Sequence, residues 1–344
     1  MHQVIHLLPY DGIGGAEAAA RSMLRTPWKG LDFRLWYIFP SVESPVRRGA
    51  TFNPLAFVRA ALGVTRERPD LLILSLWRSC VVGILAKAFR PRTRMVVVIH
   101  NSVDAHPADW LFTRIAMRLA TEVWSDSQAS LALRFRRMPK APVHVLPFLT
   151  EHLEPAHSPG GKPPSPGFVF WGRLAAQKNL RRSLELFRIL RASAPEARYT
   201  IIGPDAGELE GLRELCRQSG LEDAVQFTGP KSFEEICAIA AGCRFYLQTS
   251  DYEGMAMSVV EAMQLGLVPV VTPVGEIGRY CRAWENAIVV QDVAEAAAEV
   301  LALLHDPHKA RSMGNAAMAT WRGQPLYRDA VAAACRRLIS QEAS

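Results

Sequence analysis

Twelve short apolar segments, separated by stretches of helical periodicity, constrain the fold of this chain more than any other feature of its sequence. Most of them are continuously apolar, a pattern typical of strands that are buried on both faces of a parallel sheet. The intervening stretches are long enough for the crossover helices that parallel strands require. The sequence therefore predicts an α/β protein built from doubly wound parallel sheets. The predicted strands span residues 4–8, 34–39, 71–74, 95–100, 122–125, 143–146, 168–171, 199–202, 225–227, 245–248, 268–271 and 287–290.

A stretch rich in proline and glycine, residues 158–167, interrupts this alternation near the middle of the chain. Such a run sustains neither a helix nor a central strand, so it predicts a linker. The length of 344 residues fits two domains of roughly 150 residues each. We therefore predict a first domain over residues 1–157, a linker over 158–167 and a second domain over 168–320. A helical segment within 321–344 follows, which either caps the second domain or crosses back to the first.

The charge of the chain is unevenly distributed. Residues 1–150 carry a net charge of +10 and residues 151–344 a net charge of −3, which together give the formal +7 of the chain. A basic first half indicates contact with something anionic. Nucleic acid, anionic lipid, a phosphorylated substrate and a merely solvated basic surface all remain open at this point.

Features of the sequence that report on the cellular compartment favour the cytoplasm. The six cysteines are scattered and form no Cys-x-x-Cys pair, so neither a zinc site nor a disulfide framework is expected. The N-terminus lacks the ordered basic, apolar and cleavage regions of a signal peptide, and no apolar run approaches the ~20 residues of a membrane helix. Two amphipathic stretches that contain arginine, 110–119 and 131–138, fit either a membrane surface or solvated helices.

The loop after the first predicted strand has the composition of an anion site. Gly14 and Gly15 stand at the start of a helical run, where backbone N–H groups can approach an anion closely. The string Gly12-x-Gly14-x-x-Glu17 nearly matches the G-x-G-x-x-G fingerprint of dinucleotide-binding folds. Glu17 replaces the third glycine and would bring a negative charge towards a pyrophosphate. An NAD-type oxidoreductase and a plain tight turn therefore stay as alternatives to a phosphate site in this loop.

Two basic residues follow the first strand of the second domain. Gly172 frees the backbone directly after predicted strand 168–171, and Arg173 and Lys178 then stand on the loop and at the next helix start. Arginine binds phosphate oxygens with a planar fork and lysine binds them as a point charge. The pair predicts a clamp for a diphosphate, with two solvated cations as the alternative.

The strongest signal is a pair of glutamates in the segment 251–271. Glu253 follows a predicted strand, and residues 254–256 would form the start of a helix with free N–H groups. Glu261 lies within an apolar helical run, and burial of an unpaired carboxylate costs several kcal/mol, so it requires a dedicated hydrogen-bonding partner. A ribose diol suits an acceptor-only carboxylate. Glu253, on the loop, can accept hydroxyls of a sugar.

These motifs together resemble those of retaining glycosyltransferases that have the GT-B fold of two Rossmann-like domains. The resemblance is closest to glycosyltransferase family 4 and its E-x7-E motif, and it extends along most of the chain. The motifs that carry it are Gly14-Gly15-Ala16-Glu17, Gly172-Arg173-Leu174 with Lys178, Ile201-Ile202-Gly203-Pro204, Phe227-Thr228-Gly229, Glu253 with Glu261, Gly266 with Pro269-Val270-Val271, and Val274-Gly275-Glu276.

The resemblance implies two domains that face each other across a cleft, with a final helix that returns to the first domain. It implies a UDP-sugar or GDP-sugar as donor, no metal or other cofactor, and a lipid-linked or polysaccharide acceptor in surface glycan biosynthesis. The basic first domain fits an anionic lipid-linked acceptor and a peripheral position at the inner face of the membrane. No nucleic-acid partner is expected.

Carried over residue by residue, the resemblance also implies roles. Arg173 and Lys178 would neutralise the diphosphate, Glu253 would hold sugar hydroxyls, Glu261 would bind the ribose, and His100 would face the transferred sugar as a proton shuttle or a positioning residue. The catalytic residues that it implies are Glu253, His100, Arg173 and Lys178. The donor-binding residues that it implies are Gly14, Gly15, Arg173, Lys178, Gly203, Gly229, Glu253, Gly254, Met255, Ala256 and Glu261.

One segment departs from the family pattern. Residues 146–150 read Leu-Pro-Phe-Leu-Thr, where family members often have an Asn-Gly-x-Asp-like turn. The departure concerns the hinge between the domains and any acceptor contacts there. A nucleotide-sugar hydrolase or epimerase on the same fold, and a non-catalytic GT-B protein, remain as further alternatives.

Overall fold

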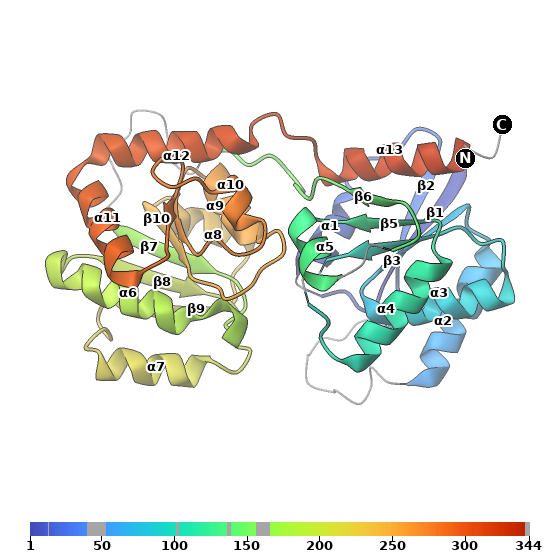
Figure 1. The fold of residues 1–344 in the computed structure, drawn as a ribbon, viewed down its shortest axis with the longest axis horizontal. Helices are drawn as coiled ribbons and strands as arrows, with labels where there is room; N and C mark the ends of the chain where they lie inside the picture. Colours follow the sequence, from blue (N-terminus) through green and yellow to red (C-terminus); the bar gives the residue numbers. More distant parts are fainter. Residues whose placement is uncertain (13, 40–52, 101–102, 136–138, 156–165, 341–344) are drawn as a thin grey trace. The chain divides into compact units, whose positions relative to one another are not determined.

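The computed structural model describes residues 1–12, 14–39, 53–100, 103–135, 139–155 and 166–340. The chain divides into two compact units (Figure 1). The first comprises Met1–Glu151 together with Gln324–Ser344, and the second comprises His152–Gly323. Most of the proline- and glycine-rich stretch predicted as a linker lies outside the described residues, and the division falls before it.

The first unit contains a six-stranded sheet in which every pairing is parallel. Its strand order is β2-β1-β3-β4-β5-β6, and β3, β4 and β5 are buried along their whole length. The strands are β1 His2–Leu8, β2 Leu31–Tyr37, β3 Leu71–Ser75, β4 Met95–Ile99, β5 Glu122–Ser125 and β6 Val143–Val145. The helices are α1 Gly15–Ser22, α2 Pro54–Glu67, α3 Trp77–Phe89, α4 Pro107–Leu119, α5 Gln128–Arg134 and α13 Tyr327–Ser340.

The second unit repeats this architecture with the strand order β12-β11-β10-β7-β8-β9, again with parallel pairing throughout. The strands are β7 Gly167–Trp171, β8 Arg198–Ile202, β9 Val225–Gly229, β10 Phe245–Gln248, β11 Val268–Val271 and β12 Ile288–Val289. A 3-10 turn, η2 Ala176–Lys178, precedes the first helix. The helices are α6 Leu180–Ser193, α7 Leu209–Gln218, α8 Phe233–Ala240, α9 Met257–Gln264, α10 Ile277–Tyr280, α11 Val293–His305 and α12 Pro307–Trp321.

The prediction of an α/β fold with two doubly wound parallel sheets is confirmed, and each predicted strand overlaps an observed one. The boundaries of β2 differ, since the strand runs over Leu31–Tyr37 and not over 34–39. Its first residues pair in register with His2 and the residues after it, which periodicity alone does not reveal. The amphipathic stretch 131–138 is only partly helical, because α5 ends at Arg134, and residues 136–138 lie outside the described residues.

The C-terminal helix α13 belongs to the first unit. Arg337 on α13 donates two hydrogen bonds of 2.6 and 2.8 Å to the buried carboxylate of Glu122 in β5. At the other end of the helix, the amide of Tyr327 donates to the carbonyl of Leu149 at 2.7 Å. An ion pair at one end and a backbone hydrogen bond at the other hold this distant segment of the chain against the sheet.

Candidate active site

The strand order of the second unit explains why two distant loops meet. The chain fills the sheet from β7 through β8 to β9 and then returns to the other side of β7 with β10. In doubly wound sheets such a reversal opens a ligand-binding crevice at the carboxyl ends of the two strands involved. The loop after β7 carries Gly172, Arg173 and Lys178, and the loop after β10 carries Glu253.

Lys178 and Glu253 form an ion pair across this switch point. The Lys178 Nζ atom lies 2.7 Å from Glu253 Oε1, and the two side chains are only 14% and 7% exposed. The backbone supports the pairing, because the amide of Asp251 donates to the carbonyl of Gln177 at 3.0 Å. The two residues predicted separately for diphosphate and sugar are thus one coupled unit.

A buried set of polar side chains orients the Glu253 carboxylate. Its Oε1 atom also accepts hydrogen bonds from Gln248 Nε2 at 3.1 Å and from Ser250 Oγ at 2.7 Å. The carbonyl oxygen of the Gln248 side chain accepts in turn from Tyr246 at 2.7 Å and from Ser258 at 3.0 Å. Burial raises the pKa of Tyr246 well above its ordinary value, so its hydroxyl stays protonated as a donor, with the side-chain oxygen of Gln248 at 2.7 Å and the carbonyl of Trp171 at 3.2 Å as acceptors.

The segment 254–256 presents backbone amides at the start of α9. Its carbonyls point to the neighbouring loop, because Gly254 accepts from the amide of Glu276 at 3.0 Å and Met255 accepts from the Tyr280 hydroxyl at 2.9 Å. Ala256 adopts a left-handed conformation with φ of +55° and caps the helix without a side-chain hydrogen bond. Within the described ranges, the amides of residues 254–256 donate to no protein group. Such a row of amides at a helix N-terminus is suited to an anion.

Glu261 has the dedicated partner that its setting in an apolar helix requires. The indole N–H of Trp171, the last residue of β7, donates to Glu261 Oε2 at 2.8 Å. The Trp171 ring is itself fixed by an edge-to-face contact with Tyr246, with the ring centroids 4.5 Å apart. The carboxylate is therefore held by one oxygen in a defined orientation at the end of the sheet.

Three glycines predicted at strand ends come together on the other side of β7. The amide of Gly203 donates to the carbonyl of Gly229 at 2.9 Å. A Cβ atom on Gly203, whose φ is +146°, would lie 1.8 Å from the carbonyl oxygen of Gly172. Only glycine permits this approach of two backbones. The Arg173 side chain, by contrast, is exposed and makes no hydrogen bond or ion pair with any residue that the structure describes.

In the first unit, the side chain of Glu17 packs against the glycines of the loop after β1, Gly12 and Gly14. Its side chain is buried, and a Cβ atom added to Gly14 would lie 2.5 Å from Glu17 Oε2. The carboxylate is therefore packed against the backbone that a dinucleotide pyrophosphate would need to approach. This arrangement disfavours the NAD alternative, and it means that an anion near Gly15, the first residue of α1, would meet the charge of Glu17.

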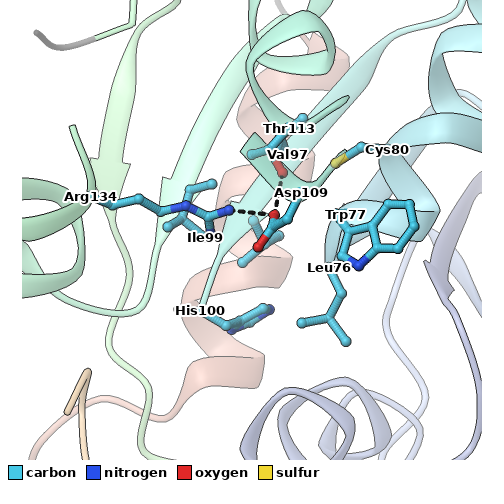
Figure 2. A pocket seen from close by; sticks show the side chains of 10 residues that line it. Leu76, Trp77, Cys80, Val97, Ile99, His100, Asp109, Thr113 and Arg134 are labelled. Carbon is cyan, nitrogen blue, oxygen red and sulfur yellow. Dashed lines mark hydrogen bonds and ion pairs between the residues drawn. The ribbon is translucent and has the colours of Figure 1, made fainter. Parts of the chain in front are cut away.

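His100, the other predicted residue in the first unit, follows β4 and has a side chain only 5% exposed. Burial, and to a smaller extent the charge of Arg134, lowers its pKa to about 3, so the ring is neutral near pH 7. The ring lines a small cavity with Leu76 and Trp77, and Figure 2 shows Arg134 and Asp109 on its opposite wall. Leu76 has a strained left-handed φ of +68°, which is typical of functional sites.

The predictions from the sequence missed the residues that orient the site. Trp171, Gln248 and Ser250 end or directly follow buried strands. Buried polar side chains need hydrogen-bonding partners, so polar residues at the carboxyl end of an otherwise apolar strand are a usable signal. That signal was available for Gln248 and Ser250, which directly precede the loop of Glu253.

Two further features are absent from the described residues, a metal-binding cluster and a membrane-spanning helix. No three His, Cys, Asp or Glu side chains in the described ranges are close enough to hold a metal ion together. No described helix combines the length and the apolar character that are needed to cross a bilayer.

Similarity to known sequences covers part of the chain. Residues 157–320 match the family model of glycosyl transferases group 1. The chain is 28% identical over 173 residues to the GDP-mannose:cellobiosyl-diphosphopolyprenol alpha-mannosyltransferase of Xanthomonas campestris. This match covers 47% of this chain and 45% of the relative. It is also 28% identical over 163 residues to the mannosylfructose-phosphate synthase of Agrobacterium fabrum, which covers 45% of this chain and 33% of that relative. The matches thus span less than half the length of these curated relatives.

Similarity to solved structures extends over the whole chain. The Anabaena protein Alr3699/HepE, solved in complex with UDP and glucose, superposes with a TM-score of 0.76 at 18% identity and covers 99% of this chain and 100% of its own. Sucrose-phosphate synthase from Thermosynechococcus elongatus gives a TM-score of 0.75 at 16% identity with full coverage of both chains. At these identities the likeness establishes the GT-B fold. The match to the family model of glycosyl transferases group 1, over residues 157–320, falls on the second unit.

Proposed function

We propose that this protein is a retaining hexosyltransferase, which moves a hexose from a nucleotide-diphosphate sugar to a lipid-linked or polysaccharide acceptor in surface glycan biosynthesis. The observation that carries the proposal is the buried Lys178–Glu253 pair beside the unengaged amides of residues 254–256. The Glu253 carboxylate, which can accept sugar hydroxyls, lies at the same switch point as Lys178 and the backbone amides, which can bind phosphate. The family match to residues 157–320 supports this assignment.

In this proposal the donor is held by groups that favour its diphosphate. The helix N-terminus of α9 and the amides of residues 254–256 offer donors to phosphate oxygens, and the exposed Arg173 adds a flexible guanidinium. Lys178 keeps one N–H on Glu253 and has others for a phosphate oxygen. Glu261, held by Trp171 through Oε2, is the ribose acceptor. These groups stabilise the negative charge that develops on the leaving diphosphate.

Transfer then proceeds on one face of the sugar. The bond between the anomeric carbon and the diphosphate oxygen breaks, and the acceptor hydroxyl oxygen forms its bond to the same carbon from the same side. The hydroxyl proton goes to the departing phosphate oxygen, so the products are the glycosylated acceptor and the nucleoside diphosphate. No divalent metal is required in this scheme, because Arg173, Lys178 and the amides supply the neutralisation.

The acceptor side of the proposal rests on the first half of the chain. Its net charge is +10, and α4 exposes Trp110 (51%) and Leu111 (44%) near Arg114 and Arg118. Apolar side chains next to arginines suit an anionic lipid surface. The Xanthomonas relative is named for a diphosphopolyprenol-linked acceptor and GDP-mannose. A polyprenol-diphosphate glycan is accordingly the acceptor we propose to test first.

Product analysis tests the proposal directly. The protein is incubated with a panel of UDP- and GDP-hexoses and a polyprenol-diphosphate acceptor, and the products are separated by mass and anomeric configuration. We expect a glycosylated acceptor with retained configuration, and an Arg173→Ala variant with lower turnover. Free hexose formed equally with and without acceptor would identify a hydrolase, and an inverted product would refute the retaining step.

A further inference from the structure

Three side chains from adjacent strands form a buried hydrogen-bonded chain beneath the switch point of the first sheet. His6 lies in β1, Ser75 is the last residue of β3, and His100 follows β4, and these strands are neighbours in the sheet. His6 Nε2 lies 2.8 Å from Ser75 Oγ, which lies 2.9 Å from His100 Nε2. His6 and Ser75 are completely buried. The hydrogen bond with Ser75 therefore fixes Nε2 as the nitrogen of His100 that faces inwards.

Few protons are available for the hydrogen bonds among His6, Ser75 and His100. Burial lowers the pKa of His6 to about 3, with a smaller contribution from the neighbouring His100, and the pKa of His100 is lowered similarly, so each neutral ring carries one N–H near pH 7. Ser75 has one hydroxyl proton. It can donate to only one of the two histidines. The direction of hydrogen-bond donation from His6 through Ser75 to His100, or the reverse, thus determines both tautomers.

Surrounding groups favour one direction. His100 Nδ1 lies 4.0 Å from Asp126 Oδ2, where an N–H is attracted to the carboxylate and a lone pair is repelled. The Nδ1 atoms of His6 and His100 are both buried without a hydrogen-bonding partner among the described residues, so either direction leaves one N–H unsatisfied. An unsatisfied N–H is less costly beside a carboxylate, so the proton belongs on His100 Nδ1, and His6 carries its proton on Nε2. His6 then donates to Ser75, and Ser75 donates to His100 Nε2.

We infer that Ser75 and His6 are positioning residues, which hold His100 as the Nδ1–H tautomer with Nε2 occupied by the Ser75 hydroxyl. This inference rests on the proposed function and on the role that the family resemblance implies for His100, a histidine that faces the transferred sugar. His100 then serves as a fixed surface for the sugar and takes no proton from the acceptor. That proton goes to the leaving phosphate. The Phe148 ring, 5.3 Å from His100 between centroids, completes the packing of the imidazole.

The first test reads the tautomers without any reaction. Two-bond proton–nitrogen correlation spectra of the full chain labelled with 15N-histidine distinguish protonated from bare ring nitrogens, and His100→Asn and His6→Asn variants assign the signals. We expect Nδ1–H for His100 and Nε2–H for His6. The opposite tautomer of His100 overturns the inference whatever the activity of the protein.

The second test uses a matched pair of serines. Ser75→Ala removes the donor to His100, whereas Ser79→Ala makes the same change at another completely buried serine, on α3. We expect Ser75→Ala to change the signal of His100 Nε2, because this nitrogen loses its hydrogen bond, and to lower kcat about tenfold with little change in the donor KM, as for loss of one hydrogen bond. Ser75→Thr, which keeps the hydroxyl, should retain the wild-type Nε2 signal of His100.

The outcomes separate the inference from the proposed function. If the wild-type protein transfers no hexose from any donor, the proposed function fails while the spectra still decide the tautomers. If transfer is normal and Ser75→Ala keeps the wild-type His100 signal and the wild-type kcat, the positioning role is refuted. An equal loss of kcat in Ser79→Ala would also refute it, because the effect would then come from packing alone.

Discussion

Replacement of Lys178 in the Lys178–Glu253 pair should destabilise the protein, and a second substitution, at Glu253, should restore most of the lost stability. The pair is nearly buried, with the two side chains 14% and 7% exposed. Removing one partner of a buried ion pair costs about 3–5 kcal/mol, because the other charge is left without compensation. For a unit of this size, Lys178→Met should therefore lower the melting temperature by roughly 6–20 °C, at about 2–4 °C per kcal/mol. Glu253→Gln in the same protein removes the stranded charge and should recover most of that loss.

Activity should respond differently from stability in this experiment. Both the single and the double variant lack the groups that bind the donor, so neither should regain turnover. Calorimetry gives the melting temperatures and initial-rate assays give the turnover. Lys231→Met is the matched control, because Lys231, which precedes α8, pairs with Glu235 at the surface, with the two side chains 29% and 51% exposed. The loss of such a pair should leave both quantities unchanged. A Lys178→Met melting temperature equal to wild type, or no recovery in the double variant, would refute the view of a buried, coupled pair.

Three further predictions concern the second carboxylate, the C-terminal helix and metal ions. Trp171→Phe removes the indole N–H that holds Glu261 and should weaken donor binding about tenfold by titration calorimetry, as expected for one hydrogen bond to a charged group; unchanged affinity would place the ribose elsewhere. At Glu122, burial acts to raise the pKa of the carboxyl, but hydrogen bonds from Arg337 and Trp124 outweigh it and lower the pKa below 4.5. The stabilisation by this pair is thus present above the pKa of the unfolded state and is lost as the pH falls through the pKa of the folded state. In denaturant titrations, the difference in stability between wild type and Arg337→Met should be full at pH 7 and should shrink below pH 4.5. A difference that does not depend on pH would contradict the pairing. EDTA should leave the initial rate of hexose transfer unchanged, and loss of activity that magnesium restores would show that a divalent ion takes part.

Much of the fold could be predicted because its strands are continuously apolar. Segments such as 71–74 and 95–100 contain almost no polar residue, so buried parallel strands were the natural interpretation. The start of β2 was harder to place, because Asp32 interrupts the apolar pattern and the strand extends to Leu31 through pairing with β1. The limits of an edge strand depend on its neighbour, and local periodicity does not contain that information.

Individual site residues could be predicted, but their pairing could not. Lys178 and Glu253 are separated by 75 positions in the sequence. They meet because β10 lies next to β7 in the sheet, and the strand order does not follow from the apolar pattern. The same applies to Trp171 and Glu261, and to the chain from His6 to His100. Each contact joins residues from different strands or from the segments that follow them, so it becomes visible only when the topology is known.

The pairing changes how the charge of the donor site should be understood. Lys178 is compensated by Glu253, so the net positive charge available to a diphosphate comes from Arg173 and from backbone amides. Lys178 then acts mainly by linking the carboxylate to a phosphate oxygen, so that sugar and diphosphate are positioned by one rigid pair. Residues that act as a unit have strongly non-additive effects on catalysis. Lys178→Met, Glu253→Gln and the double variant should accordingly lose similar factors in turnover, whereas losses that multiply would mean that the two side chains act separately on the donor.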